Sequence, residues 1–510
     1  MVHRGRPSAA CGPCRSRRLK CDQKKPFCSQ CIRAKRECSG YRDVFAGRFY
    51  DQTEEVKRKN SPSSSPPSSS ALSPPRKRRL DWSGLSDSLV QQHISVPLND
   101  HGTAFVLARY LNRVGLNGAR GTTASFLPGV LGSPSGRAMA ASMNAVGLAA
   151  LSNIHQSSEL RLSARQEYIS ALAETNAMLS DQTMSTSDAS LVAVTFLGLF
   201  ELMTCDGPPL MEKYLKHVEG CAKLLQLRGS DQLKDPIGLA LFSQFRMIIV
   251  LGNFWMKKRT PSWLLQLSHE ALAHRDDGEA AEDELFLLMA RVGDLCANLR
   301  NGAVIEPAQF VKKALKMDAE LGAWATAVKP NHRYIIVNVS ESANEVNGDS
   351  PFQPVHGNHY HIYPNTAVSS WWNDYRFVRL ILLELICWLC DHLARKDEAA
   401  GVEYRQTIAH RTALSQQLTD DICASVPYHL GATEQSPCED WTSDRSGSAV
   451  RLIWPLFVAA DCTGTTPQTL DWIADTLFKI GYGVGVHQAL VMSNFLRAGR
   501  HLLWLPELGG

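Results

Sequence analysis

The sequence predicts a mainly α-helical protein that begins with a small metal-bound cluster and continues, through a disordered linker, into a large all-α body. Six of the 14 cysteines fall within 28 residues near the N-terminus, and a run rich in Ser and Pro follows them. The remaining chain carries apolar residues at helical spacing. We expect these three parts to span residues 8–42, 43–95 and 96–510.

The charge of the chain is distributed unevenly. The formal net charge is +4 over 510 residues, but residues 1–80 carry 20 Lys and Arg against 6 Asp and Glu. The rest of the chain has the opposite balance, with 34 basic and 44 acidic residues. A basic N-terminal part on a mildly acidic body favours a polyanionic partner for the N-terminal part.

Two classes of protein are disfavoured by the sequence. The N-terminal residues MVHRGRPSAACG contain no apolar run of the length that a secretory signal needs. No stretch has the roughly 18 uncharged apolar residues of a membrane helix. The nearest candidate, Val378–Cys390, contains Arg379 and Glu384 and is predicted to be a buried core helix. We therefore expect no membrane partner and a reducing compartment, where clustered cysteines bind metal more often than they form disulfides.

The clustered cysteines repeat one half-motif. CGPCRSRRLKC returns 17 residues later as CSQCIRAKREC, which gives the spacing C-x2-C-x6-C-x6-C-x2-C-x6-C. Two half-motifs indicate two metal ions, and two tetrahedral zinc ions need eight ligand positions. Six thiolates fill eight positions only if two of them bridge both ions. The predicted zinc ligands are Cys11, Cys14, Cys21, Cys28, Cys31 and Cys38.

Two other interpretations of these cysteines fit the sequence less well. A disulfide framework does not suit the expected compartment. A single zinc site of four cysteines (Cys11, Cys14, Cys28, Cys31) leaves the other two without a role despite the repeat. With two ions the cluster carries a charge of −2, which the surrounding Lys and Arg offset. Because the segment is too small for an apolar core, metal binding has to supply most of its folding energy.

ACGPCRSRRLKCDQKKPFCSQCIRAKRECSGY resembles the fungal Zn(2)-C6 binuclear zinc cluster of transcription factors. The resemblance implies that Cys11 and Cys28 bridge the two ions, with one further pair of cysteines on each ion. It places Pro26 in the loop that joins the two halves. It also implies that a short helix after Cys14 enters the major groove and reads a CGG triplet.

The same resemblance assigns roles to the basic residues that follow Cys14. Arg18 becomes the best candidate for a base contact, with Arg17 beside it. Many relatives have Lys where this chain has Arg18, and both side chains can donate to guanine O6 and N7. Arg15 and Lys20 are expected to bind phosphates and so to fix the register on the duplex. The basic residues of the second half-motif are equally consistent with solvated charges.

The linker combines a flexible run with a basic tetrad. Between Ser61 and Pro75, 13 of 15 residues are Ser or Pro, a composition that cannot bury apolar surface. Four basic residues then follow, and they are typical of a nuclear import signal: Arg76, Lys77, Arg78 and Arg79. An incidental solubilising run or a tether to the DNA backbone is the alternative.

The body is predicted to be helical throughout, with Tyr334–Val339 the best candidate for a strand. Leu215, Val218, Ala222 and Leu225 form one stripe that ends at Gly229, and a second stripe comprises Tyr168, Ile169, Leu172 and Leu179. Further helices are expected near 138–153, 188–204, 237–256, 368–394, 447–460 and 467–498.

This body also resembles the helical fungal-specific transcription factor domain. The similarity lies in segments such as HVEGCAKLLQLRG, SSWWNDYRFVRLILLEL and RLIWPLFVAA, and it spans most of residues 100–500. It implies regulation, subunit contact or effector sensing rather than catalysis, so we do not expect an enzyme. The chain has no G-x-S-x-G and no P-loop, and GYGVGVH at 481–487 lacks the spacing of a nucleotide-binding loop.

Several other polar motifs of the body have a structural interpretation. We interpret His356, His359 and His361 as part of a solvated loop rather than a zinc site, because no acidic or Cys partner is adjacent in sequence. Cys387 and Cys390, and likewise Trp371 and Trp372, are expected to pack in the core. The acidic stretch Asp276–Glu284 is expected to decorate the start of a helix.

Together these features favour a nuclear, sequence-specific DNA-binding transcription factor of RNA polymerase II genes that binds CGG-type sites in double-stranded DNA. Its expected partners are that DNA and the transcription machinery. The absence of a long apolar heptad argues against a zipper, so a homodimer would have to form through the body. The subfamily often governs biosynthetic (secondary metabolite) or nutrient pathways. The alternatives are an effector-sensing body that binds a small molecule, or a zinc-stabilised protein-interaction module without DNA readout.

Overall fold

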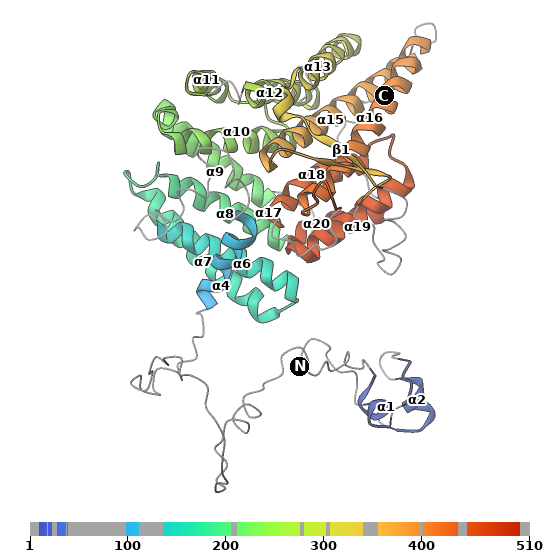
Figure 1. Ribbon diagram of the computed structural model, residues 1–510. Helices are drawn as coiled ribbons and strands as arrows, with labels where there is room; N and C mark the ends of the chain where they lie inside the picture. The colour runs from blue at the N-terminus through green and yellow to red at the C-terminus, as the bar shows by residue number, and fades with distance from the viewer. Residues whose placement is uncertain are drawn as a thin grey trace, which may run out of the picture. The chain divides into compact units, whose positions relative to one another are not determined.

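The computed structural model describes residues 10–17, 19–22, 28–36, 38, 98–111, 136–205, 212–275, 280–301, 306–339, 355–396, 401–436 and 446–499. The chain divides into two compact units, Met1–His93 and Ile94–Gly510 (Figure 1). The predicted boundary of the body, residue 96, is close to this division. The predicted linker, by contrast, lies outside the described residues.

The N-terminal unit contains two very short helices, α1 (Gly12–Ser16) and α2 (Ser29–Arg33). Five residues are far fewer than a helix needs to be stable by itself in water. The buried residues of this unit are Ala10 and five of the six clustered cysteines, with Cys21 packed against them. Among its described residues, the unit therefore has a core of sulfur atoms rather than of apolar side chains.

The first half of the body is a succession of helices that starts at α4 (Leu98–Val106) and its π-helical extension η2 (Leu107–Leu111). Side-chain caps define several helix starts: Ser157, Ser187 and Asp235 each accept a backbone N–H of the first turn. The helices that follow are α6 (Gly136–His155), α7 (Ser158–Ser180), α8 (Asp188–Thr204), α9 (Glu212–Arg228), η3 (Gly229–Leu233) and α10 (Pro236–Met256).

The second half of the body continues the helical pattern around the long pair α15 (Thr366–Lys396) and α16 (Gly401–His429). Before this pair lie α11 (Ser262–Ala271), η4 (Leu272–His274), α12 (Ala280–Arg300), α13 (Pro307–Ala327) and η5 (Pro330–His332). After it lie α17 (Ser446–Ala449), η6 (Val450–Leu452), α18 (Ile453–Asp461), α19 (Pro467–Val484) and α20 (His487–Arg497).

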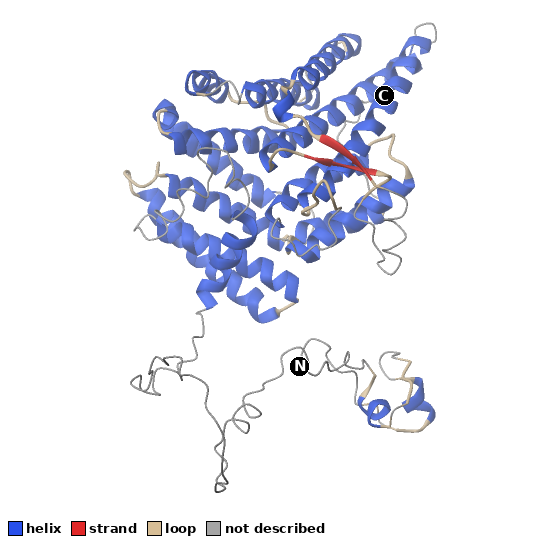
Figure 2. Ribbon diagram, viewed as in Figure 1, coloured by secondary structure: helices blue, strands red, loops and turns tan. Residues whose placement is uncertain are grey.

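The body also contains one small antiparallel sheet (Figure 2). Strand β1 (Ile335–Asn338) pairs with β2 (His359–Ile362), and Ile335 lies opposite Ile362. The strand predicted at Tyr334–Val339 is confirmed, whereas β2 was not predicted. The mainly α fold class is thus confirmed, and this hairpin is the departure from an all-α body within the described residues.

Most predicted helices are confirmed, with two corrections. Ile169 was placed on the buried stripe of α7 but is 67% exposed, because the buried face of that helix runs through Ala164, Ala171 and Met178. The segment 467–498 is interrupted at Gly485, whose φ of +86° is favourable for glycine and ends α19.

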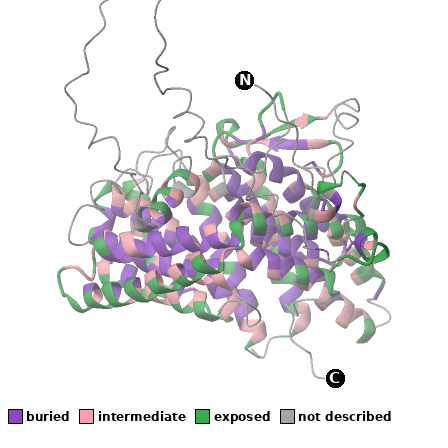
Figure 3. Cartoon of the chain, turned by 90° about the horizontal axis from the view of Figure 1, so that it is seen from below, coloured by how far each residue is buried: buried purple, intermediate pink, exposed green. Residues whose placement is uncertain are grey.

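One helix, α10, is long and apolar enough to cross a membrane, with a mean hydropathy of 1.6 over its best window. The sequence predicted this helix, near 237–256, but the shorter run in α15 was named as the nearest membrane candidate. In the body 67% of that window is buried, and the guanidinium of Arg246 in the middle of the helix pairs with Asp283. Helix α10 is therefore a core helix. Figure 3 shows that buried positions run through the helices of the body.

Candidate metal centre

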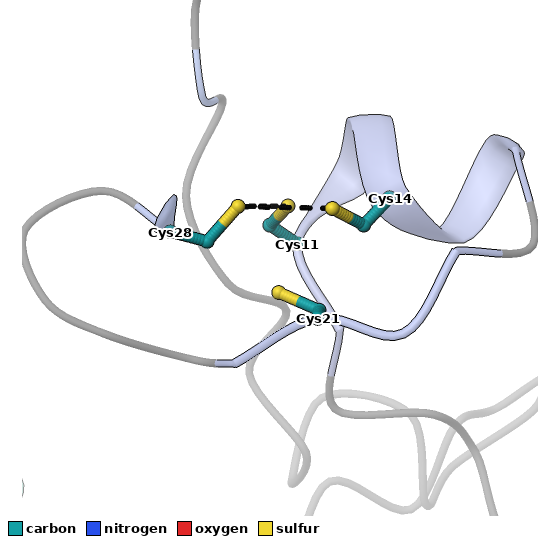
Figure 4. A group of neighbouring side chains, drawn as sticks. All are labelled: Cys11, Cys14, Cys21 and Cys28. Carbon is teal, nitrogen blue, oxygen red and sulfur yellow. Dashed lines mark hydrogen bonds between the residues drawn. The ribbon is translucent and has the colours of Figure 1, made fainter. Parts of the chain in front are cut away.

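The six clustered cysteines come together in two overlapping groups. Cys11, Cys14, Cys21 and Cys28 form one group, and Cys11, Cys28, Cys31 and Cys38 form the other. Within each group all sulfur atoms lie within 4.8 Å of one another. Cys11 and Cys28 belong to both groups, which is the sharing that the ligand count requires for two ions. Figure 4 shows the first group, in which the four sulfur atoms converge.

The spacing of the sulfur atoms suits tetrahedral zinc. The Sγ atom of Cys11 lies 3.5 Å from that of Cys28 and 3.7 Å from that of Cys31, and the Sγ atoms of Cys14 and Cys28 are 3.7 Å apart. Four sulfur atoms at about 2.3 Å from a tetrahedral zinc ion lie about 3.8 Å from each other. The thiolates are thus already at the separation that a shared metal ion imposes.

Burial and mutual proximity oppose thiolate formation in the absence of metal. Burial raises the pKa of the Cys11 thiol well above the usual range and also raises the pKa of the Cys14 thiol. The pKa of Cys31 is raised to about 12, first by its contact with Cys28 and then by burial. A divalent cation reverses this effect, because it supplies the positive charge that buried thiolates otherwise lack. The site is therefore suited to hold metal rather than free thiolates.

Backbone groups orient the second half of the site. Cys28 caps α2, and its Sγ atom accepts the backbone N–H of Cys31 at 3.3 Å. Helix α2 ends where Lys35 adopts a φ of +45°, and the N–H of Arg36 bonds to the carbonyl of Cys31. This turn leaves Arg33, Lys35 and Arg36 exposed.

The predicted DNA-contacting residues are only partly described. Arg17 and Lys20 are exposed, the backbone of Arg15 lies in α1, and Arg18 lies outside the described residues. Helix α1 was expected after Cys14, but it begins at Gly12 and ends at Ser16. Pro13 is tolerated in this first turn, where its missing N–H costs nothing. Arg17 and Lys20 thus follow the helix instead of lying on it.

Two further predicted features, Pro26 and the basic tetrad 76–79, also lie outside the described residues. The import signal therefore stays a prediction. In the body, Cys387 and Cys390 are buried in α15, as is Trp372, and Trp371 is half-buried. These core assignments are confirmed.

The described part of the acidic stretch begins a helix as expected, since Glu282 and Asp283 lie in the first turn of α12, and these carboxylates also have a further role. Asp283 is 3% exposed and pairs with the fully buried Arg246, and Glu282 accepts a hydrogen bond of 2.6 Å from Arg275. These carboxylates start α12 but compensate buried guanidinium groups instead of facing solvent. Arg246 lies 37 residues from Asp283, and sequence patterns gave no signal for that pair.

The histidine motif also differs from the expected solvated loop. His359 and His361 belong to β2, and His361 is fully buried beside Arg376 and Tyr363. Burial, with the positive charge of Arg376, lowers the pKa of His361 to about 2. The structure brings Asp421 to within 3.9 Å of the His361 Nε2 atom, an acidic neighbour that the sequence alone did not reveal.

Comparison with known proteins is consistent with this geometry. Residues 9–46 match the fungal Zn(2)-Cys(6) binuclear cluster domain, and residues 137–333 match the fungal specific transcription factor domain. Both parts of the chain are thus similar to the fungal Zn(2)-C6 transcription factors. The cluster domain of these transcription factors binds two zinc ions, and the thiolate groups of this chain fit two ions.

The similarity to individual relatives is confined to short segments, so the chain spans less than a quarter of the length of each. An uncharacterised transcriptional regulatory protein of Schizosaccharomyces pombe is 53% identical over 38 residues, which is 8% of this chain and 7% of that protein. White-opaque regulator 2 of Candida albicans is 49% identical over 39 residues, 8% of this chain and 9% of that protein. An uncharacterised protein of Emericella nidulans is 26% identical over 100 residues, 20% of this chain and 21% of that protein. No solved structure matches the chain.

Proposed function

We propose that this protein is a nuclear, sequence-specific DNA-binding regulator of RNA polymerase II genes that binds CGG-type sites through its zinc cluster. The observation that carries the proposal is the pair of thiolate groups that share Cys11 and Cys28, next to exposed basic residues. We assign the six clustered cysteines as zinc ligands, with these two as bridges. The cluster would thus present a rigid, positively charged surface to DNA.

The basic residues after Cys14 divide into two roles in this proposal. Arg18 donates to guanine edges, with Arg17 beside it, and these contacts read the sequence. Arg15 and Lys20 bind phosphates, which fixes the register and carries no sequence information. The tetrad 76–79 directs the protein to the nucleus, and the helical body carries regulation, subunit contacts and binding to the transcription machinery, without catalysis.

Equilibrium binding of the zinc-loaded full chain to CGG-containing and scrambled duplexes at one salt concentration tests this proposal. Wild-type protein should prefer the CGG duplex markedly. The Arg18→Ala variant should lose about 1–3 kcal/mol on the CGG duplex and much less on the scrambled one. The Lys20→Ala variant is the matched control, because a phosphate contact weakens binding to both duplexes alike.

Two outcomes would contradict the proposal. Equal losses of Arg18→Ala on both duplexes would make Arg18 a phosphate contact instead of a base contact. Equal, weak binding of the wild-type chain to both duplexes would favour the zinc-stabilised protein-interaction module that does not read DNA.

A further inference from the structure

A hydrogen bond that involves no sulfur atom joins the two half-motifs of the cluster. Asp22 directly follows Cys21, the last cysteine of the first half, and Ser29 directly follows Cys28, the first cysteine of the second half. The backbone N–H of Ser29 donates to Oδ1 of Asp22 at 3.1 Å and lies 3.4 Å from its Oδ2 atom. The carboxylate therefore links two residues that each neighbour a cysteine of the first metal group.

The Ser29 N–H has no acceptor within its own helix. Ser29 is the first residue of α2, and the first N–H groups of a helix need acceptors from outside it. Cys28 Sγ accepts the N–H of Cys31, two residues further into the helix. Asp22 accepts the N–H of Ser29, so these two N–H groups have different acceptors. Five residues separate Asp22 from Cys28. The bond joins the chain before these residues to the chain after them.

This bond is a feature of the junction and not of the repeat. When the two half-motifs are superposed by sequence, Asp22 corresponds to Ser39 and Ser29 corresponds to Gly12. The carboxylate thus occurs only where the first half passes into the second. At that point a misplaced Cys28 would remove one ligand from both metal groups.

We propose that Asp22 is a positioning residue of the zinc cluster, which holds Cys28 in place against Cys21 by accepting the N–H of Ser29. This inference rests on the proposed ligand assignment and adds a residue that is not itself a ligand. The useful property of Asp22 is its acceptor oxygen, which an Asn side chain also has.

Zinc release from the full, zinc-loaded chain to a chelating dye measures this role. The Asp22→Ala variant should release zinc about three- to tenfold faster than wild type, the range expected for loss of one hydrogen bond. The Asp22→Asn variant should stay close to the wild-type rate because its Oδ1 atom still accepts. Gln30→Ala, at an exposed position of the same helix, is the matched control and should leave the rate unchanged.

A Ser29→Pro variant removes the donor instead of the acceptor. Proline suits the first position of a helix, and the φ of −72° and ψ of 145° at Cys28 are compatible with a following proline. Ser29→Pro should accelerate zinc release as much as Asp22→Ala does. The double variant should be no faster than either single variant, because both remove the same bond.

Three results would overturn the inference: a wild-type release rate for Asp22→Ala, additive effects in the double variant, or an Asp22→Asn variant as fast as Asp22→Ala. Failure of the ligand assignment looks different. In that case the wild-type chain would not hold two zinc ions, or Cys28→Ala would still hold both.

Discussion

The N-terminal unit and the body both need buried contacts to stay folded, but they obtain these contacts by different means. The body buries a large set of apolar side chains, including fully buried residues such as Phe242, Phe286 and Phe457. The described residues of the N-terminal unit bury mainly cysteines, and the two helices found there have five residues each. The comparison teaches that metal–thiolate bonds take the place of an apolar core where the chain is too short to form one.

The two units also use arginine differently. In the cluster Arg17 and Arg33 are exposed, where they add to a positive surface. In the body Arg246 and Arg376 are fully buried and lie over aromatic rings, with Arg246 4.6 Å from the ring centroid of Phe286. Exposed arginines are available to a polyanion, whereas buried ones require carboxylates such as Asp283 in return.

The largest expected effect separates the two units completely. Cys28→Ala removes a shared ligand from both metal groups, so the chain should lose both zinc ions. The unfolding transition of the body should be unchanged. Atomic absorption measures the zinc content per chain and so checks the loss of both ions. Helical circular dichroism during urea unfolding checks that the body is unchanged. A variant that retains two zinc ions would refute the bridging role of Cys28.

A core substitution in the body should have the opposite effect, because it should destabilise the body and leave the zinc content unchanged. Phe286 is fully buried on α12, and Phe286→Ala should lower the free energy of unfolding of the body by about 3–5 kcal/mol. The zinc content should stay at two ions per chain. Leu162→Ala, at a position that is 61% exposed, is the matched control and should change stability by less than about 0.5 kcal/mol. Zinc loss in Phe286→Ala would show that the units do not fold independently.

Removal of a buried carboxylate should lower the free energy of unfolding of the body nearly as much as Phe286→Ala does. Asp318 on α13 is 2% exposed, and it bonds to Arg379 of α15 at 2.6 Å and to Arg411 of α16. Asp318→Ala should cost about 3 kcal/mol, because two guanidinium groups lose their counter-charge. The exposed pair Arg395–Asp391 provides the comparison, and Asp391→Ala should cost at most about 0.5 kcal/mol in the same urea titration. Equal effects would contradict the role of burial.

The smallest expected effect is a pH dependence of the body. Burial raises the pKa of Asp374 to about 7, against the opposing charge of Arg451 and with a further contribution from Glu282. The protonated carboxyl therefore stabilises the fold below about pH 4, and this contribution is lost as the pH rises to about 7. Asp374→Asn should flatten this dependence, measured by urea unfolding at pH 4 and pH 8. An unchanged dependence in the variant would contradict the raised pKa.

Local patterns in the sequence predicted the metal groups and most helices. The cysteine spacing is contained within 28 residues, and apolar stripes identify helices such as α9 without knowledge of the rest of the chain. Helix α16 was not predicted as a separate element, because its buried residues are concentrated from Ser415 onward and its first half shows no clear stripe.

Features that depend on distant partners were not predictable. Asp283 and Arg246 are 37 residues apart, and Asp318 and Arg411 are 93 residues apart. Strand β2 is recognisable only through its pairing with β1 and its packing on α16. The Asp22–Ser29 bond spans only seven residues but involves a backbone donor, which leaves no mark in the pattern of side chains.

Chelation of the full chain tests the central claim most directly. A strong zinc chelator would be titrated into one sample, while zinc release, binding to a CGG duplex and helical circular dichroism are followed together. The account predicts that DNA binding disappears as both zinc ions leave, while the helical signal of the body persists. DNA binding that survives loss of both ions, or a body that unfolds with them, would contradict it.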